Sequence, residues 1–100
     1  MKNNQIGSRL NSKGEEYTTE AVIKNVTVLL RNDTPLISFL IHNVDSTTAV
    51  YQIHPLKSTF REIMKAFNVK DISHIVGRKI TAYWDAPCGS PAIIGFKPND

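Results

Sequence analysis

The chain has 100 residues, a formal net charge of +3 and a single cysteine, Cys88. This length supports one small domain, and one cysteine excludes an internal disulfide, which fits a reducing compartment. No stretch reaches the roughly 20 apolar residues of a membrane-spanning helix, and the first residues lack the apolar core of a signal peptide. We therefore expect a cytoplasmic protein that does not enter a membrane.

Residues 1–19 are polar, include Gly7 and Gly14, and show no hydrophobic period. Chain ends of this composition are often poorly ordered. We therefore expect a flexible polar tail over residues 1–19, followed by a single folded domain over residues 20–98.

The domain contains segments that alternate between apolar and polar residues in the manner of β-strands. They cover residues 20–31, 36–44, 49–54, 78–85 and 92–97. Asn32–Pro35 is a turn by composition, and Pro35 is expected outside a central strand because it has no backbone donor. Gly95, inside the last segment, suggests a bend or the close approach of another backbone segment.

Alternation also assigns side chains to the two faces of each strand. In the first strand, Val22 and Val26 should share the apolar face, with Lys24 between them near an edge. In the last strand, Ile94 should point inward and Ile93 outward.

One clear helix is predicted over residues 56–69, between the third and fourth strands. Its apolar residues fall on one stripe of a 3.6-residue helix: Leu56, Phe60, Ile63, Met64 and Phe67. Residues 71–76 add one helical turn, capped by Asp71 and ended by Gly77.

The order of three strands, one helix and two strands resembles that of the OB-fold, a small and partly open barrel that often holds oligonucleotides. The resemblance spans about residues 20–98 and rests on element order, without a family-specific motif. It implies a mainly β protein, a five-stranded barrel whose helix plugs one end. An open five-stranded sheet with one packed helix is the alternative architecture.

The resemblance also implies a binding face on the second and third strands, between the loops at 31–35 and 86–91. Nucleic-acid-binding proteins of this fold stack bases on aromatic rings and hold phosphates with basic side chains. The candidate residues are Arg31, His42, Tyr51, His54, Arg78, Lys79, Tyr83 and Lys97. Tyr83 is the preferred stacking residue because Thr81 and Lys79 share its face, whereas Trp84 is expected in the core. An alternative interpretation of Tyr51 is that its ring seals the barrel. An alternative for each basic residue is a solvated surface charge without a ligand.

No motif for catalysis or metal binding is present in the sequence. The histidines His42, His54 and His74 form no close ligand pair with one another or with Cys88, as a zinc site needs. Cys88 lies in a Gly- and Pro-containing loop, and no base is assigned to it. We therefore expect no enzymatic activity, no cofactor and no metal.

Three classes of function remain. The first is a small non-catalytic module that binds single-stranded DNA or RNA with little sequence preference, in keeping with the mild basicity. The alternative is a protein-interaction domain, such as an accessory subunit or inhibitor, whose apolar strand Leu36–Leu40 binds either a protein partner or a second copy in a homodimer. Oligosaccharide or small-molecule binding is a third class. Exposed tyrosines near Arg78 and Lys79 would favour nucleic acid, and exposed leucines a protein partner.

Overall fold

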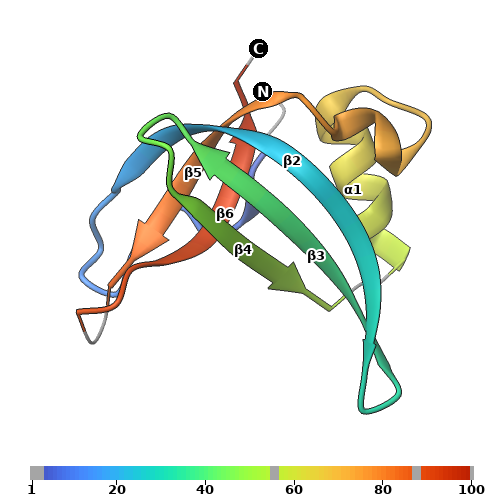
Figure 1. Cartoon of the computed structure of the whole chain (residues 1–100), viewed down its shortest axis with the longest axis horizontal. Helices are drawn as coiled ribbons and strands as arrows, with labels where there is room; N and C mark the ends of the chain where they lie inside the picture. Colours follow the sequence, from blue (N-terminus) through green and yellow to red (C-terminus); the bar gives the residue numbers. More distant parts are fainter. Residues whose placement is uncertain (1–3, 55–56, 87–88, 100) are drawn as a thin grey trace.

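The computed structural model describes residues 4–54, 57–86 and 89–99. It contains one antiparallel six-stranded sheet, one α-helix and one 3-10 turn (Figure 1). The elements are β1 (Ile6–Gly7), β2 (Thr18–Arg31), β3 (Thr34–Asn43), β4 (Thr48–Ile53), α1 (Lys57–Phe67), η1 (Ile72–Ile75), β5 (Lys79–Asp85) and β6 (Ala92–Pro98). The predicted mainly β fold, with its helix between the third and fourth predicted strands, is confirmed.

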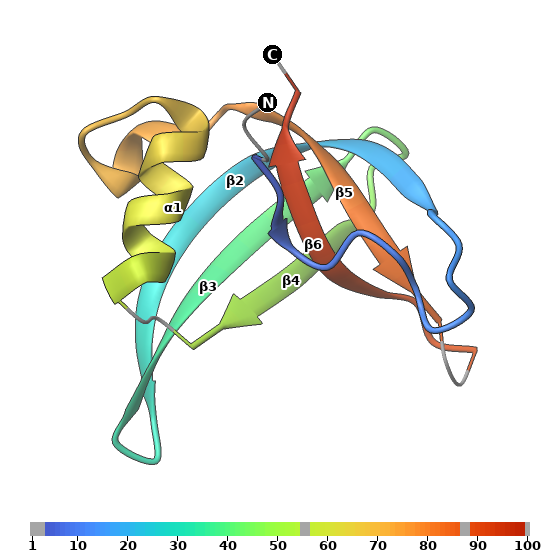
Figure 2. The same cartoon turned by 180° about the vertical axis from the view of Figure 1, so that it is seen from behind.

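The strands follow the order β1-β6-β5-β2-β3-β4 across the sheet. The sheet curls strongly, so that β4 and β6 approach each other although they lie far apart in that order (Figure 2). Within the described part of the chain, no ladder of hydrogen bonds joins β4 to β6 or β1. The molecule is therefore only approximately a barrel, because its sheet is not closed.

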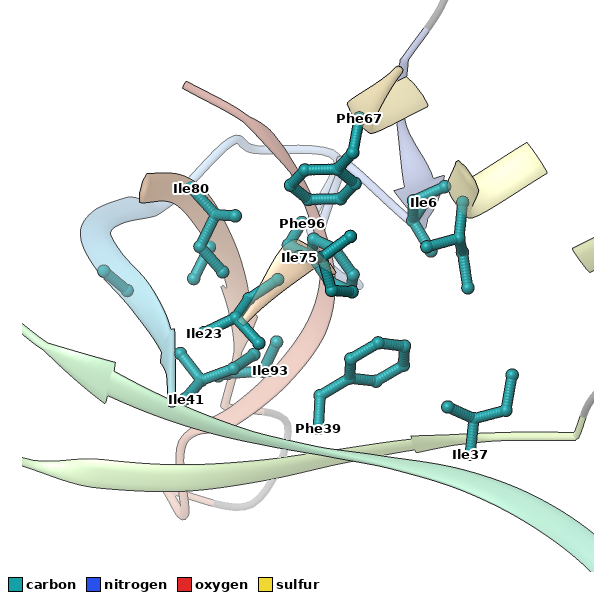
Figure 3. Packing of buried hydrophobic residues seen from close by; sticks show 13 residues of the cluster. Ile6, Ile23, Ile37, Phe39, Ile41, Phe67, Ile75, Ile80, Ile93 and Phe96 are labelled. Atoms are coloured by element: carbon teal, nitrogen blue, oxygen red, sulfur yellow. The ribbon is translucent and has the colours of Figure 1, made fainter. Parts of the chain in front are cut away.

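The hydrophobic core fills the concave side of this curled sheet (Figure 3). Phe39 of β3 and Phe96 of β6 meet there edge to face, with their ring centroids 5.1 Å apart. From α1, the buried side chains of Ile63 and Phe67 join the same cluster. This confirms the predicted apolar stripe of the helix at these positions, while Leu56 lies outside the described residues.

The end of α1 follows from local chemistry. Asn68 has a positive φ of 55°, and the N–H groups of Asn68 and Val69 donate to the carbonyl oxygens of Lys65 and Met64. This is a Schellman motif, in which asparagine takes the left-handed position. The carboxylate of Asp71 then accepts the Ser73 N–H at 2.9 Å, which confirms the predicted cap of the next helical turn.

A β-bulge in β2 changes which side chains reach the core. The pairing of β2 with β3 skips Lys24, so that Ile23 and Val26 both point inward. Val22 pairs with His42 on the outer side instead. The prediction that Val22 and Val26 share the apolar face is therefore wrong, because an unpaired residue reverses the alternation.

A second bulge has the same effect in β6. Tyr83 of β5 pairs with Gly95, but the next residue, Trp84, pairs with Ile93, so that Ile94 is skipped. Ile93 is buried in the core, although the alternation placed it outward. One extra residue in a strand again explains the difference.

The first strand lies within the region that the sequence assigned to a flexible tail. Ile6 pairs with Phe96 and is buried in the core, and Gly7 pairs with Gly95. A Cβ atom on Gly95 would overlap the carbonyl oxygens of Ile6 and Ser8, which confirms the expected close backbone approach. The folded domain therefore begins before residue 20, and one isolated apolar residue gave no periodic signal to predict this.

Candidate functional site

The outer face of β2, β3 and β4 is the face on which the sequence predicts binding. One row across the three strands consists of Thr27, Ser38 and Gln52. The aromatic residues of these strands, Phe39 and Tyr51, belong to the inner side. This outer face is therefore mainly polar and aliphatic, and it offers a base no Phe, Tyr or Trp ring of these strands to stack on.

A hollow of about 320 Å³ lies at the hairpin end of this face. It is lined by Arg31, Asn32, Thr34, Leu36, Gln52 and His54. Asn32 and Asp33 form the two-residue turn between β2 and β3, and both have positive φ, as a type I′ turn requires. This tight turn sets Arg31 opposite Thr34, while His54 follows directly after β4.

The lining of the hollow suits an anionic ligand with hydrogen-bonding groups. Arg31 offers a guanidinium that matches a phosphate, and His54 adds an imidazole. The side-chain amides of Asn32 and Gln52 can donate and accept hydrogen bonds. No carboxylate lines the hollow, and the nearest acidic residue in the sequence is Asp33 at the tip of the turn.

His42 and Lys79 lie on the same outer face, toward its other end. Lys79 pairs with Val22, and Val22 pairs with His42, so these three residues form one row across β5, β2 and β3. The structure therefore places four predicted residues on this face, two at the hollow and two at the opposite end.

Arg78 is engaged elsewhere. Its guanidinium donates to the carbonyl oxygen of Phe67 at 3.4 Å and lies 5.6 Å from the centre of the Phe67 ring. A cation is favourable at the end of a helix, where carbonyl groups lack intrahelical partners. Arg78 thus holds the end of α1, and it does not join the hollow.

Tyr51 points inward. Its ring stacks against Phe39 at 6.1 Å and meets Phe96 edge to face at 5.9 Å. Burial raises the pKa of the Tyr51 phenol above its ordinary value of 10.0. The prediction of Tyr51 as a stacking residue is therefore wrong, and the alternative that it seals the barrel describes its position.

Tyr83 points to the outer side but is only 1% exposed. It pairs with Gly95, whose outer side is occupied by the carbonyl oxygens of Ile6 and Ser8. Figure 2 shows the N-terminal segment crossing in front of β6 and β5. The prediction of Tyr83 as an exposed platform is wrong, because this segment covers that part of the sheet. Lys97 is exposed, but it pairs with Thr81 on this other half of the sheet, away from the hollow.

A second hollow, of about 310 Å³, lies where the N-terminal segment meets the end of β5. Its lining includes the rings of Tyr17 and Trp84 and the carboxyl groups of Glu15, Glu16 and Asp85. Its acidic lining does not suit a phosphate. Trp84 packs against the core, as the sequence predicts, and its indole N–H donates to Thr19 at 2.7 Å.

Four lining residues of the first hollow were not among the sequence candidates: Asn32, Thr34, Leu36 and Gln52. Gln52 carried a usable signal, since it alternates with His54 on the polar face of one predicted strand. Asn32 and Thr34 lie in the loop at 31–35 that the resemblance places beside the binding face, although their composition alone is that of any tight hairpin.

Among the described residues, no three His, Cys, Asp or Glu side chains gather in a group that could hold a metal ion. Cys88 lies outside the described residues. No helix in the described part of the chain has the length and apolar character needed to cross a membrane. No protein-family model, curated protein or solved structure matches the chain.

Proposed function

We propose that this protein is a non-catalytic module of the OB-fold type, which binds single-stranded DNA or RNA on the outer face of β2, β3 and β4. The observation that carries this proposal is the hollow at the hairpin end, where Arg31 and His54 lie with two side-chain amides and no carboxylate. The element order and the position of this face support the OB-fold assignment. A chain with a single cysteine suits the cytoplasm.

In the proposed complex, Arg31 binds a backbone phosphate through charge-assisted hydrogen bonds. Lys79 and His42 offer a second contact at the other end of the face. His42 follows Leu36 by six positions along β3, a distance of about 20 Å at a rise of about 3.3 Å per residue. A strand of several nucleotides fits this span, with Gln52 and Asn32 reaching base edges.

The aliphatic character of the face sets the expected strength of binding. Stacking of a base on an aromatic ring contributes about 1–3 kcal/mol, and the outer sides of β2, β3 and β4 carry no Phe, Tyr or Trp ring. The affinity therefore rests on phosphate contacts, which are insensitive to sequence and weaken steeply with salt. We expect micromolar binding at low salt with little preference among bases.

Fluorescence anisotropy with a labelled single-stranded oligonucleotide tests this proposal, at low and at physiological salt. Arg31→Ala should weaken binding about tenfold, since hydrogen bonds to charged groups contribute about 1.5–3 kcal/mol. It should also reduce the slope of log K against log salt by about 0.7. Arg61→Ala, on the exposed side of α1, is the matched control and should leave both quantities unchanged. Absence of binding at low salt, or an equal loss in both variants, would reject the proposal.

Protein interaction is the second candidate function, and one observation favours it. Val28, Leu29 and Leu30 are consecutive aliphatic residues, all exposed, near the tip of the β2–β3 hairpin. The strand predicted for self-association is less suited, because Leu36 is buried and β3 lies between β2 and β4. The three consecutive residues of β2 are therefore the stronger candidate for an apolar interface.

A further inference from the structure

The β2–β3 hairpin projects beyond the rest of the sheet, and Figure 1 shows its tip extending past α1 and β4. The ladder between β2 and β5 ends at Val22, where it pairs with Lys79. The backbone of Ile23 still bonds to Gly77 and Arg78. From residue 25 to residue 31, β2 pairs only with β3 in the described structure, so one backbone edge of the hairpin is open.

The turn determines which backbone groups point to this open edge. In a two-residue hairpin, the flanking residues Arg31 and Thr34 form a hydrogen-bonded pair. Because such pairs alternate, Leu29 also directs its N–H and C=O toward β3. Val28 and Leu30 therefore direct theirs away from β3, toward the open edge.

The two edges of the hairpin differ. On β3, the residue opposite Leu30 is Pro35, which has no N–H to offer a further strand. Pro35 lies within β3 and not in the expected turn, but β4 begins to pair only at Ile37, so the missing N–H of Pro35 faces no third strand. Proline and charged residues commonly protect sheet edges from pairing. The β2 edge has neither between residues 25 and 30.

The side chains along the unprotected edge are apolar. Val28 is 55% exposed, Leu29 41% and Leu30 76%. They lie on both faces of the ribbon, because successive residues of a strand point to opposite sides. An open edge with such side chains is a template for pairing with a further strand.

We propose that two copies of this chain associate through this edge, with their β2 strands antiparallel about a two-fold axis at Leu29. In this register Val28 of one copy bonds to Leu30 of the other, and the two Leu29 side chains meet on the axis. All the exposed aliphatic side chains of the edge are then brought together. This inference rests on the second candidate function, protein interaction, and names its partner and interface. It does not depend on nucleic-acid binding.

Backbone geometry and charge both favour this register. Pairing of Lys24 with Arg31 of the second copy would oppose two like charges. It would also set Val28, whose backbone points outward, against Thr27, whose backbone is bonded to β3, so that no ladder forms. A second copy is the occupant because the edge complements itself, as a two-fold interface requires.

The dimer would join the two sheets and place both outer faces on one side. Arg31 of one copy then lies opposite Thr27 of the other, and the two hollows border the same axis. The ladder is short, so we expect a weak, concentration-dependent dimer rather than an obligate one.

Sedimentation velocity of the full chain tests this, in reducing buffer, without nucleic acid, from micromolar to near-millimolar concentration. The weight-average mass should rise from 11.2 kDa toward twice that value. Leu29→Glu, which places two carboxylates on the axis, should stay monomeric. Leu30→Pro should also stay monomeric, because it removes an outward donor and leaves the β2–β3 ladder intact.

Leu10→Glu is the control, since Leu10 is an exposed aliphatic residue outside the hairpin. It should associate as the unmodified chain does, and circular dichroism should show the same fold for every variant. A constant mass of 11.2 kDa for the unmodified chain would overturn the proposal. So would association of folded Leu29→Glu, or loss of association in Leu10→Glu. Anisotropy of Leu30→Pro with an oligonucleotide is a separate readout of the nucleic-acid proposal, because this substitution adds no charge near the hollow.

Discussion

The two halves of the outer side of the sheet differ in their exposure to solvent. On β2, β3 and β4 it faces solvent, and an outward residue such as Gln52 is exposed. On β5 and β6 the N-terminal segment crosses it, and the outward Tyr83 is buried. Strand alternation is the same in both halves. It determines the side to which a residue points, and a distant segment determines whether that side reaches water.

The covering segment is held at several points along its length. Ile6 enters the core, and the Ser8 N–H donates to the carbonyl of Ile94 at 2.9 Å. Farther along, the backbone N–H and hydroxyl of Ser12 donate to the carboxylate of Asp85, each at 3.1 Å. The segment is thus part of the domain, and the difference between the two halves can be tested by loosening it.

The largest effect is expected from Ile6→Ala, which removes the only core side chain that the covering segment supplies among the described residues. The free energy of unfolding should fall by about 2 kcal/mol, the low end for a buried isoleucine, because a chain end can relax. Chemical denaturation measures this. Leu10→Ala, at an exposed position of the same segment, should change it by less than about 0.5 kcal/mol. Equal effects of the two substitutions would contradict the buried position of Ile6.

A smaller effect is expected from Gly95→Ala at the crossing itself. The added methyl group overlaps the backbone oxygens of Ile6 and Ser8, which cannot rotate away as a side chain can. Unfolding free energy should fall by about 1–2 kcal/mol, as for other overpacked sites. Ser38→Ala, on the open half, is the matched control and should change it by less than about 0.5 kcal/mol. Hydrogen exchange at the Ser8 amide should become faster in Gly95→Ala alone.

The smallest effect is expected from Tyr51→Phe, whose ring contacts with Phe39 and Phe96 are kept. Because burial raises the pKa of Tyr51, the unfolded chain releases this proton first as the pH rises. The stabilisation is complete below about pH 10 and is lost as the pH rises through the raised pKa. Above about pH 10, the free energy of unfolding should therefore fall more steeply with pH in the unmodified protein than in Tyr51→Phe. Urea denaturation at a series of pH values measures this difference. Identical alkaline profiles would show that Tyr51 does not contribute.

The sequence predicted the elements well because their signals are local. Alternation located five strands, and a 3.6-residue stripe located α1 with Ile63 and Phe67 facing the core. Turn and cap residues such as Asp71 and the Asn32–Asp33 pair act on their immediate neighbours, so their roles could be deduced without the tertiary structure.

Side-chain faces were predicted correctly only on the C-terminal side of each bulge, at Val26 and Phe96. Lys24 and Ile94 are each skipped in the ladder, and beyond each of them the inward face changes. A bulge depends on pairing with a neighbouring strand, which a single strand does not encode in its alternation. Val22 and Ile93 were assigned to the wrong side for this reason.

The sequence by itself determined β2 to β6, the helix and the candidate residues Arg31, His42, His54 and Lys79 of the outer face. Only the tertiary structure decided that Arg31 and His54 share one hollow, that Tyr51 turns inward, and that residues near Ser8 cover Tyr83. The physical reason is range: propensity and alternation act over a few neighbouring residues. Burial instead depends on segments such as β1 and β6, which are remote in the chain and meet only when it folds.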